Sequence, residues 1–114
     1  MSQFQVKTRI AKRYARGLYK AAKEKKALEA GLKDITLLKD VFDAHSALSK
    51  ALAAPVYKEK QKEEILFAFF EKFGAKTQPH AVTKQFIILL GKQGRFDLTA
   101  EIVKHSYETF LHQK

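Results

Sequence analysis

Apolar side chains recur every three or four residues along almost the whole sequence, and a sustained alternation of apolar and polar residues occurs nowhere. The first spacing is that of one face of an α-helix, whereas a half-buried strand requires the alternation. The sequence therefore predicts an all-α fold without strands. Because 114 residues are close to the usual size of one domain, we expect residues 1–114 to form a single domain.

Interruptions of this pattern divide the chain into six expected helices. Gly74 is expected to end the fourth helix as a left-handed cap, Pro79 suits the first turn of the fifth helix, and Gly94 is expected to end that helix. Asp97 or Thr99 is expected to cap the sixth. The connections are short, which favours a six-helix bundle. The expected helices span residues 7–26, 27–45, 46–53, 58–73, 79–93 and about 99–114.

Several classes of protein are disfavoured by what the sequence lacks. It has no cysteine, which excludes disulfides, thiol catalysis and thiolate metal sites. Its four histidines have no metal-binding spacing, and no P-loop, GxGxxG or GxSxG motif occurs. No apolar run approaches the ~20 residues that span a bilayer, and the first residues contain no secretory signal. We therefore expect a soluble, non-catalytic protein without metal or cofactor.

Positive charge is concentrated near the start of the chain. The formal net charge is +10, and residues 1–30 contain nine lysines and arginines against two glutamates. Such a face could neutralise the phosphates of nucleic acid or anionic lipid headgroups, but lysine-rich solvated helix faces are also common. No zinc-finger spacing, RNP-like strand or glycine-rich RNA loop accompanies the charge. A basic helical module that binds nucleic acid or an anionic membrane remains an alternative function.

The expected fifth helix contains five successive large apolar residues, FIILL at 86–90. Since five residues cover more than one turn, this helix is either enclosed on every side or leaves one side open as an apolar groove for a partner helix. The expected first helix could supply the other wall. It places the small residues Ala11, Gly17 and Ala21 beside larger apolar ones, and small residues let another helix approach closely.

Four short motifs occur in a characteristic order. They are RYARGLY at 13–19, ALE at 27–29, LAAP at 52–55 followed by Lys62, and FIILL at 86–90 followed by GRF at 94–96. Together, at this spacing, they resemble the N-terminal domain of the delta subunit of F-type ATP synthase, called OSCP in mitochondria. The resemblance covers essentially the whole chain.

The resemblance implies a six-helix domain on the catalytic head that grips the N-terminal helix of an alpha subunit between its first and fifth helices. Gly94 and Arg95 match the Gly-Arg that ends the fifth helix, while Arg13 and Lys20 are expected at the rim. Gly17 stands where alanine is common, and Ile88 where a polar residue is common. The partner-binding residues implied by the motifs are Tyr14, Gly17, Leu18, Ala21, Phe86, Leu89 and Gln93.

The implied function is mechanical. A non-catalytic stator component would hold the head static during proton-driven ATP synthesis, on the cytoplasmic face of a bacterial inner membrane or the matrix side of the mitochondrial one. In the full complex the family also engages the peripheral-stalk b subunit, through a further segment to which nothing in this sequence corresponds. No nucleic-acid partner is expected under this interpretation.

Overall fold

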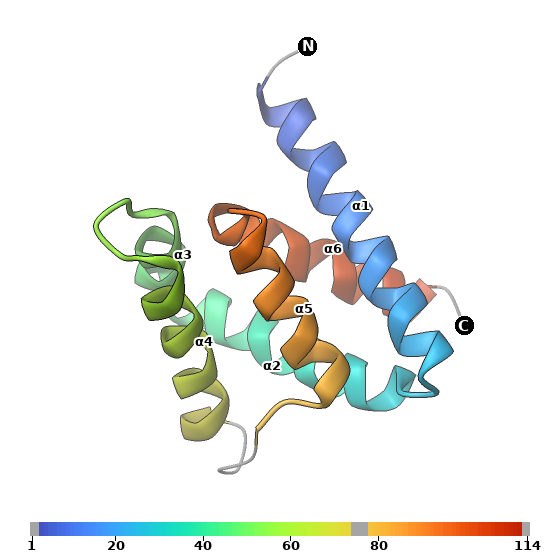
Figure 1. Cartoon of the computed structure of the whole chain (residues 1–114). Coiled ribbons are helices and arrows are strands. Elements are labelled where there is room, and N and C mark those ends of the chain that lie inside the picture. Colours follow the sequence, from blue (N-terminus) through green and yellow to red (C-terminus); the bar gives the residue numbers. More distant parts are fainter. Residues whose placement is uncertain (1–2, 74–77, 113–114) are drawn as a thin grey trace.

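The structure is a computed structural model that describes residues 3–73 and 78–112 (Figure 1). These residues form six α-helices and one short 3-10 helix, without a strand, which confirms the predicted all-α six-helix fold. The elements are α1 (Gln3–Glu24), α2 (Leu28–Ala44), α3 (Ser46–Ala53), α4 (Glu59–Phe73), α5 (Ala81–Lys92), η1 (Phe96–Leu98) and α6 (Thr99–His112).

The helices pack around one hydrophobic core. The most extensive packing is between α1 and α6, while α5 lies between α1 on one side and α4 on the other (Figure 1). Three alanines of α1 are fully buried in the core: Ala11, Ala15 and Ala22. Larger side chains fill the centre, among them Leu18, Ile35, Leu52, Leu66, Phe70, Ile87, Leu90 and Ile102. This packing fixes α1 beside α5.

The start of α5 differs from the prediction. Pro79 precedes the helix instead of lying in its first turn, and the N-cap is His80, whose Nδ1 accepts the backbone N–H of Val82 at 3.1 Å. The backbone N–H of His80 donates to Asp34 Oδ2 on α2 at 2.9 Å, and burial raises the pKa of the Asp34 carboxyl above its usual value. The imidazole of His80 accepts a hydrogen bond from a backbone N–H of the first turn, which the side chain of a proline could not do because it has no acceptor.

The end of α5 and the start of α6 are joined by a tight turn. At the end of α5, Gly94 has φ 67° and its N–H donates to the Gly91 carbonyl at 3.0 Å, while the Arg95 N–H donates to the Leu90 carbonyl at 2.8 Å. This pair of bonds is a Schellman motif. Thr99 is the first residue of α6, and its hydroxyl donates to the Phe96 carbonyl at 2.7 Å, so it does not act as the expected cap. The expected cap Gly74 lies outside the described residues.

A second Schellman motif ends α1, but without glycine. The Lys26 N–H donates to the Lys23 carbonyl at 3.1 Å, and the Ala27 N–H donates to the Ala22 carbonyl at 2.8 Å. Lys26 consequently has φ 55°, a left-handed conformation that costs a non-glycine residue about 1–2 kcal/mol. The helix therefore ends two residues before the predicted boundary at residue 26.

We expect Lys26→Gly to raise the free energy of unfolding by about 1 kcal/mol, because glycine takes this conformation without the steric cost. Denaturant unfolding followed by circular dichroism measures the change. Lys25→Gly is the matched control: its φ is not positive, so glycine there only adds freedom to the unfolded chain and should lower stability. An equal effect of both substitutions would contradict the prediction.

Candidate helix-binding groove

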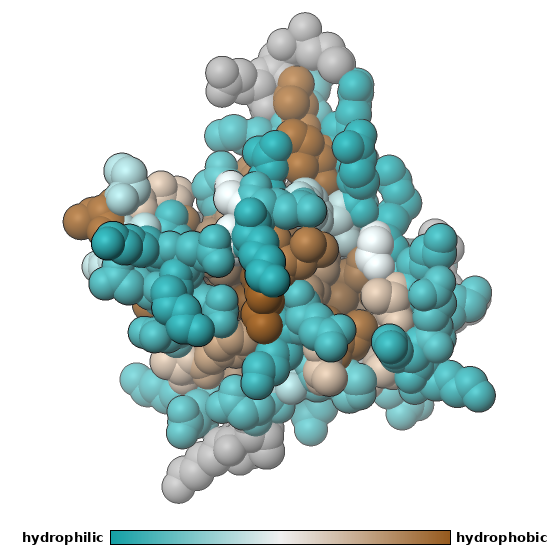
Figure 2. Space-filling model, viewed as in Figure 1, coloured by the Kyte–Doolittle hydropathy of each residue, from teal (hydrophilic) through white to brown (hydrophobic). Residues whose placement is uncertain are grey.

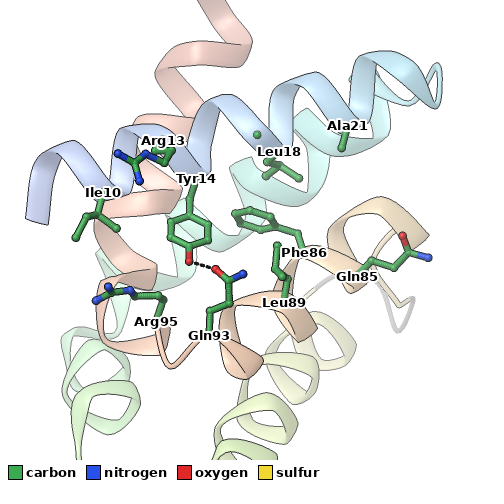
Figure 3. A pocket seen from close by; sticks show the side chains of 11 residues that line it. Ile10, Arg13, Tyr14, Leu18, Ala21, Gln85, Phe86, Leu89, Gln93 and Arg95 are labelled. Atoms are coloured by element: carbon green, nitrogen blue, oxygen red, sulfur yellow. Dashed lines mark hydrogen bonds between the residues drawn. The ribbon is translucent and has the colours of Figure 1, made fainter.

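A surface hollow of about 620 Å³ lies between α1 and α5, and we call it the α1–α5 groove (Figure 3). The structure brings all seven sequence-predicted partner-binding residues together along it. Hydrophobic side chains reach the surface over α1 and α5, between hydrophilic ones (Figure 2). The groove is lined by Ile10, Arg13, Tyr14, Gly17, Leu18, Ala21, Gln85, Phe86, Leu89, Gln93 and Arg95.

The α1 wall is formed by residues that recur every three or four positions. Leu18 is 1% exposed and belongs to both the core and the floor of the groove, whereas Tyr14 and Ala21 are half-buried. Gly17 is exposed, and a Cβ atom added there would meet no atom of this chain within 4 Å. The missing side chain at Gly17 therefore serves no packing within the described structure and leaves the helix backbone bare to the groove.

The exposure of residues along α5 decides whether the helix that contains the apolar run FIILL is enclosed on every side or has one side open. Ile87 and Leu90 are buried, and Phe86 and Ile88 are half-buried, but Leu89 is 41% exposed. Helix α5 is therefore not enclosed on every side. The ring of Phe86 meets that of Tyr14 edge-on, with centroids 6.3 Å apart, so the two walls contact each other across the floor.

One end of the groove is polar. The Tyr14 hydroxyl donates a hydrogen bond to Gln93 Oε1, which links α1 to the end of α5 (Figure 3). Arg13 and Arg95 lie at this same end. Gly94 does not line the groove, but its left-handed turn redirects the chain so that Arg95 does. The predicted rim residue Lys20 is exposed and is not among the lining residues.

Two lining residues were not singled out from the sequence. Ile10 lies one turn before Tyr14 and outside the motif at 13–19, but the helical spacing of apolar residues could have found it. Gln85 lies one turn before Leu89, but a solvent-exposed amide carries no hydropathy signal that marks it as part of an apolar site. Only the three-dimensional arrangement identifies Gln85.

Neither a metal-ligand cluster nor a membrane-spanning helix occurs in the described part of the chain. Within residues 3–73 and 78–112, His, Asp and Glu side chains nowhere gather in a group of three that could hold a metal ion. None of the helices in this part of the chain has the length and apolar content that crossing a membrane requires. The α1–α5 groove is the feature on which a functional interpretation can rest.

The fold and the groove place the chain among all-α bundles that leave an apolar cleft open between two helices. The model of the "ATP synthase delta (OSCP) subunit" family matches residues 10–114, and the chain belongs to this family. The resemblance seen in the sequence motifs is thereby confirmed.

Curated relatives agree with the family assignment. The chain is 32% identical over 95 residues to the ATP synthase subunit delta of Lactobacillus gasseri, which covers 83% of this chain and 49% of the relative. It is 31% identical over 111 residues to the cyanelle ATP synthase subunit delta of Cyanophora paradoxa, covering 97% of this chain and 56% of the relative. The chain thus spans about half the length of these relatives. No solved structure gives a significant match.

Proposed function

We propose that this chain binds the N-terminal helix of an ATP synthase alpha subunit in the α1–α5 groove. Residues 1–114 would act as one non-catalytic domain that helps to hold the catalytic head static, as a peripheral part of a membrane-bound complex. Attachment to a peripheral-stalk b subunit would need a segment beyond this chain. Family membership supports the role as a subunit of the synthase.

The observation that carries the proposal is the exposure of Leu89 at the centre of an apolar groove. Contiguous apolar surface that stays open to water marks interaction sites, and a groove between two helices suits the apolar face of an amphipathic helix. Tyr14 and Phe86 supply the large aromatic surfaces that dominate binding energy at interfaces. Torque on the head is resisted by such a contact without any chemical step.

Calorimetric titration with a synthetic peptide of the first ~25 residues of the alpha subunit from the same organism tests the proposal. We expect saturable one-to-one binding with a negative heat-capacity change, the mark of apolar burial. Affinity should fall less than about tenfold between about 50 and 200 mM salt, because apolar contact dominates. If the chain instead bound nucleic acid or an anionic membrane, its affinity for that polyanion should fall about 10³-fold or more over the same range of salt. Absence of binding would contradict the proposal.

Gly17→Ala is expected to stabilise the fold and keep peptide binding, whereas Gly17→Asp is expected to lose it. Alanine in a helix interior is favoured over glycine by up to ~1 kcal/mol, and no atom of the chain obstructs its Cβ, so the free energy of unfolding should rise. Since alanine is common at this position in the family, the partner helix should accommodate the added methyl group, whereas the carboxylate of Gly17→Asp would meet its apolar face and should weaken peptide binding by at least about tenfold. Thermal unfolding and calorimetric titration measure the two effects.

Arg16→Ala provides the comparison for both variants, because Arg16 is exposed on α1 but does not line the groove. Its removal should leave peptide affinity within about twofold of the original. If Gly17→Asp bound the peptide as tightly as the unsubstituted chain, the partner helix would not approach α1 at this point.

A further inference from the structure

The polar groups of the α1–α5 groove are unevenly distributed along it. Arg13 and Arg95 lie at the end where Tyr14 bonds to Gln93, whereas Ala21 and Gln85 lie at the opposite end (Figure 3). Leu18, Phe86 and Leu89 form the apolar stretch between the two ends. The lining residues therefore include two guanidinium groups at one end and no acidic side chain.

The two arginines have no carboxylate partner in the described part of the chain. The lysine salt bridges in that part of the chain join Lys39 to Asp43 and Lys60 to Glu63, and neither includes a groove residue. Since Arg13 is exposed and Arg95 half-buried, both can meet a group on an occupant of the groove without a large desolvation cost. Two guanidinium groups that line the same end of an apolar cleft, on either side of Ile10 in Figure 3, are suited to a carboxylate.

We propose that the occupant of the groove is an amphipathic helix that carries an Asp or Glu beyond one end of its apolar stripe, and that this carboxylate lies between Arg13 and Arg95. The inference rests on the proposed function and adds the chemistry and orientation of the partner. The charge pair fixes which way the helix lies, while the apolar stretch supplies most of the affinity.

Helix geometry sets where the carboxylate stands in the partner. Arg13 and Leu18 are five residues apart on α1, which corresponds to about 7.5 Å along the axis at 1.5 Å per residue. A partner helix that lies along α1 therefore places its carboxylate about one and a half turns from the apolar residue that contacts Leu18 and Leu89. No acidic side chain is expected at the Gln85 end, where no cation lines the groove.

Charge-reversal variants test whether a carboxylate of the partner pairs with Arg13 and Arg95 or whether the partner is only attracted to the overall positive charge of α1. The probe is the synthetic alpha-subunit N-terminal peptide, and the variants are Arg13→Glu and Arg95→Glu. Arg16→Glu is the matched control, since it makes the same charge change on an exposed position of α1 outside the groove. At about 20 mM salt we expect Arg13→Glu and Arg95→Glu each to weaken binding about tenfold, chiefly through the association rate, and Arg16→Glu less than about twofold.

A second arm identifies the partner's carboxylate. Each Asp or Glu of the peptide is changed in turn to Asn or Gln, and affinities are measured against the unsubstituted chain and against an Arg13→Gln/Arg95→Gln double variant. One peptide substitution should lower the affinity for the unsubstituted chain several-fold and leave the affinity for the double variant unchanged. In a double-mutant cycle, this result indicates a direct pair. Circular dichroism of the variants verifies that their helical content is unchanged.

The outcomes distinguish this inference from the proposed function. If Arg13→Glu and Arg95→Glu behave like Arg16→Glu while the peptide still binds, the charge pairing is wrong and the apolar groove stands. The same conclusion follows if no single peptide carboxylate couples to the double variant. If the unsubstituted chain does not bind the peptide at all, both the proposed function and this inference fall.

Discussion

Leu89→Asp is expected to weaken binding of the alpha-subunit N-terminal peptide by at least about 100-fold while the bundle remains folded. Leu89 is 41% exposed in the free chain, so an aspartate there stays hydrated and costs the fold little. In the complex, the same carboxylate would be covered by the apolar face of the partner, and burying an unpaired charge is strongly unfavourable. Calorimetric titration measures the loss, and thermal unfolding measures the stability.

Two comparisons give this experiment its meaning. Val56→Asp places a carboxylate on an apolar side chain that is 76% exposed outside the groove, and it should leave peptide affinity unchanged. Leu90→Asp alters the neighbouring residue, which is only 1% exposed, and should unfold the protein because the charge enters the core. Undiminished binding by a folded Leu89→Asp variant would exclude the groove as the binding site.

The contrast between Leu89 and Leu90 also shows what the sequence could predict. Helical spacing identified the elements, because burial of one face imposes that spacing on each helix. The residues of the two walls were implied by the family motifs. The run FIILL contains no polar residue, so hydropathy alone could not say which of its sides another element covers. That depends on where α1, α2 and α4 pack, which is a property of the whole chain.

Helix ends were predicted less well than helix faces, since several local solutions compete for the same unsatisfied backbone groups. At α5, His80 takes the cap position that a proline-led first turn would have occupied. At α1, Lys26 adopts a left-handed conformation for which its side chain gives no signal. At the polar end of the groove, the Tyr14–Gln93 bond joins residues 79 positions apart, a pairing that no local pattern indicates.

Removal of the Phe110 side chain is expected to lower the free energy of unfolding by about 3–5 kcal/mol in Phe110→Ala. Phe110 of α6 is 4% exposed, and its ring meets that of Tyr19 on α1 edge-on with centroids 5.3 Å apart. It also lies against Gly31 of α2, where an added Cβ atom would be 2.9 Å from the ring. One side chain thus holds together the three helices α1, α2 and α6.

A double-mutant cycle tests this role of Phe110 directly. Gly31→Ala alone should lower the free energy of unfolding by about 1–3 kcal/mol, since the new methyl group forces the buried ring to move. In a Phe110→Leu background, where the shorter side chain leaves room, the same substitution should instead raise it by up to ~1 kcal/mol through helix propensity. The same sign in both backgrounds would show that the ring does not set the approach of α2 to α6.

Weakening the contact between Phe110 and Tyr19 should also affect peptide binding in the α1–α5 groove. The side of α1 that faces the core is held by α6, and Phe110 contributes to that support through Tyr19. In Phe110→Leu, the wall formed by Tyr14, Gly17 and Leu18 is less firmly placed, so the peptide must order it on binding. We therefore expect weaker peptide binding with a more unfavourable entropy, even though Phe110 does not line the groove. Unchanged binding thermodynamics would show that α5 and the rest of the core position α1 without this ring.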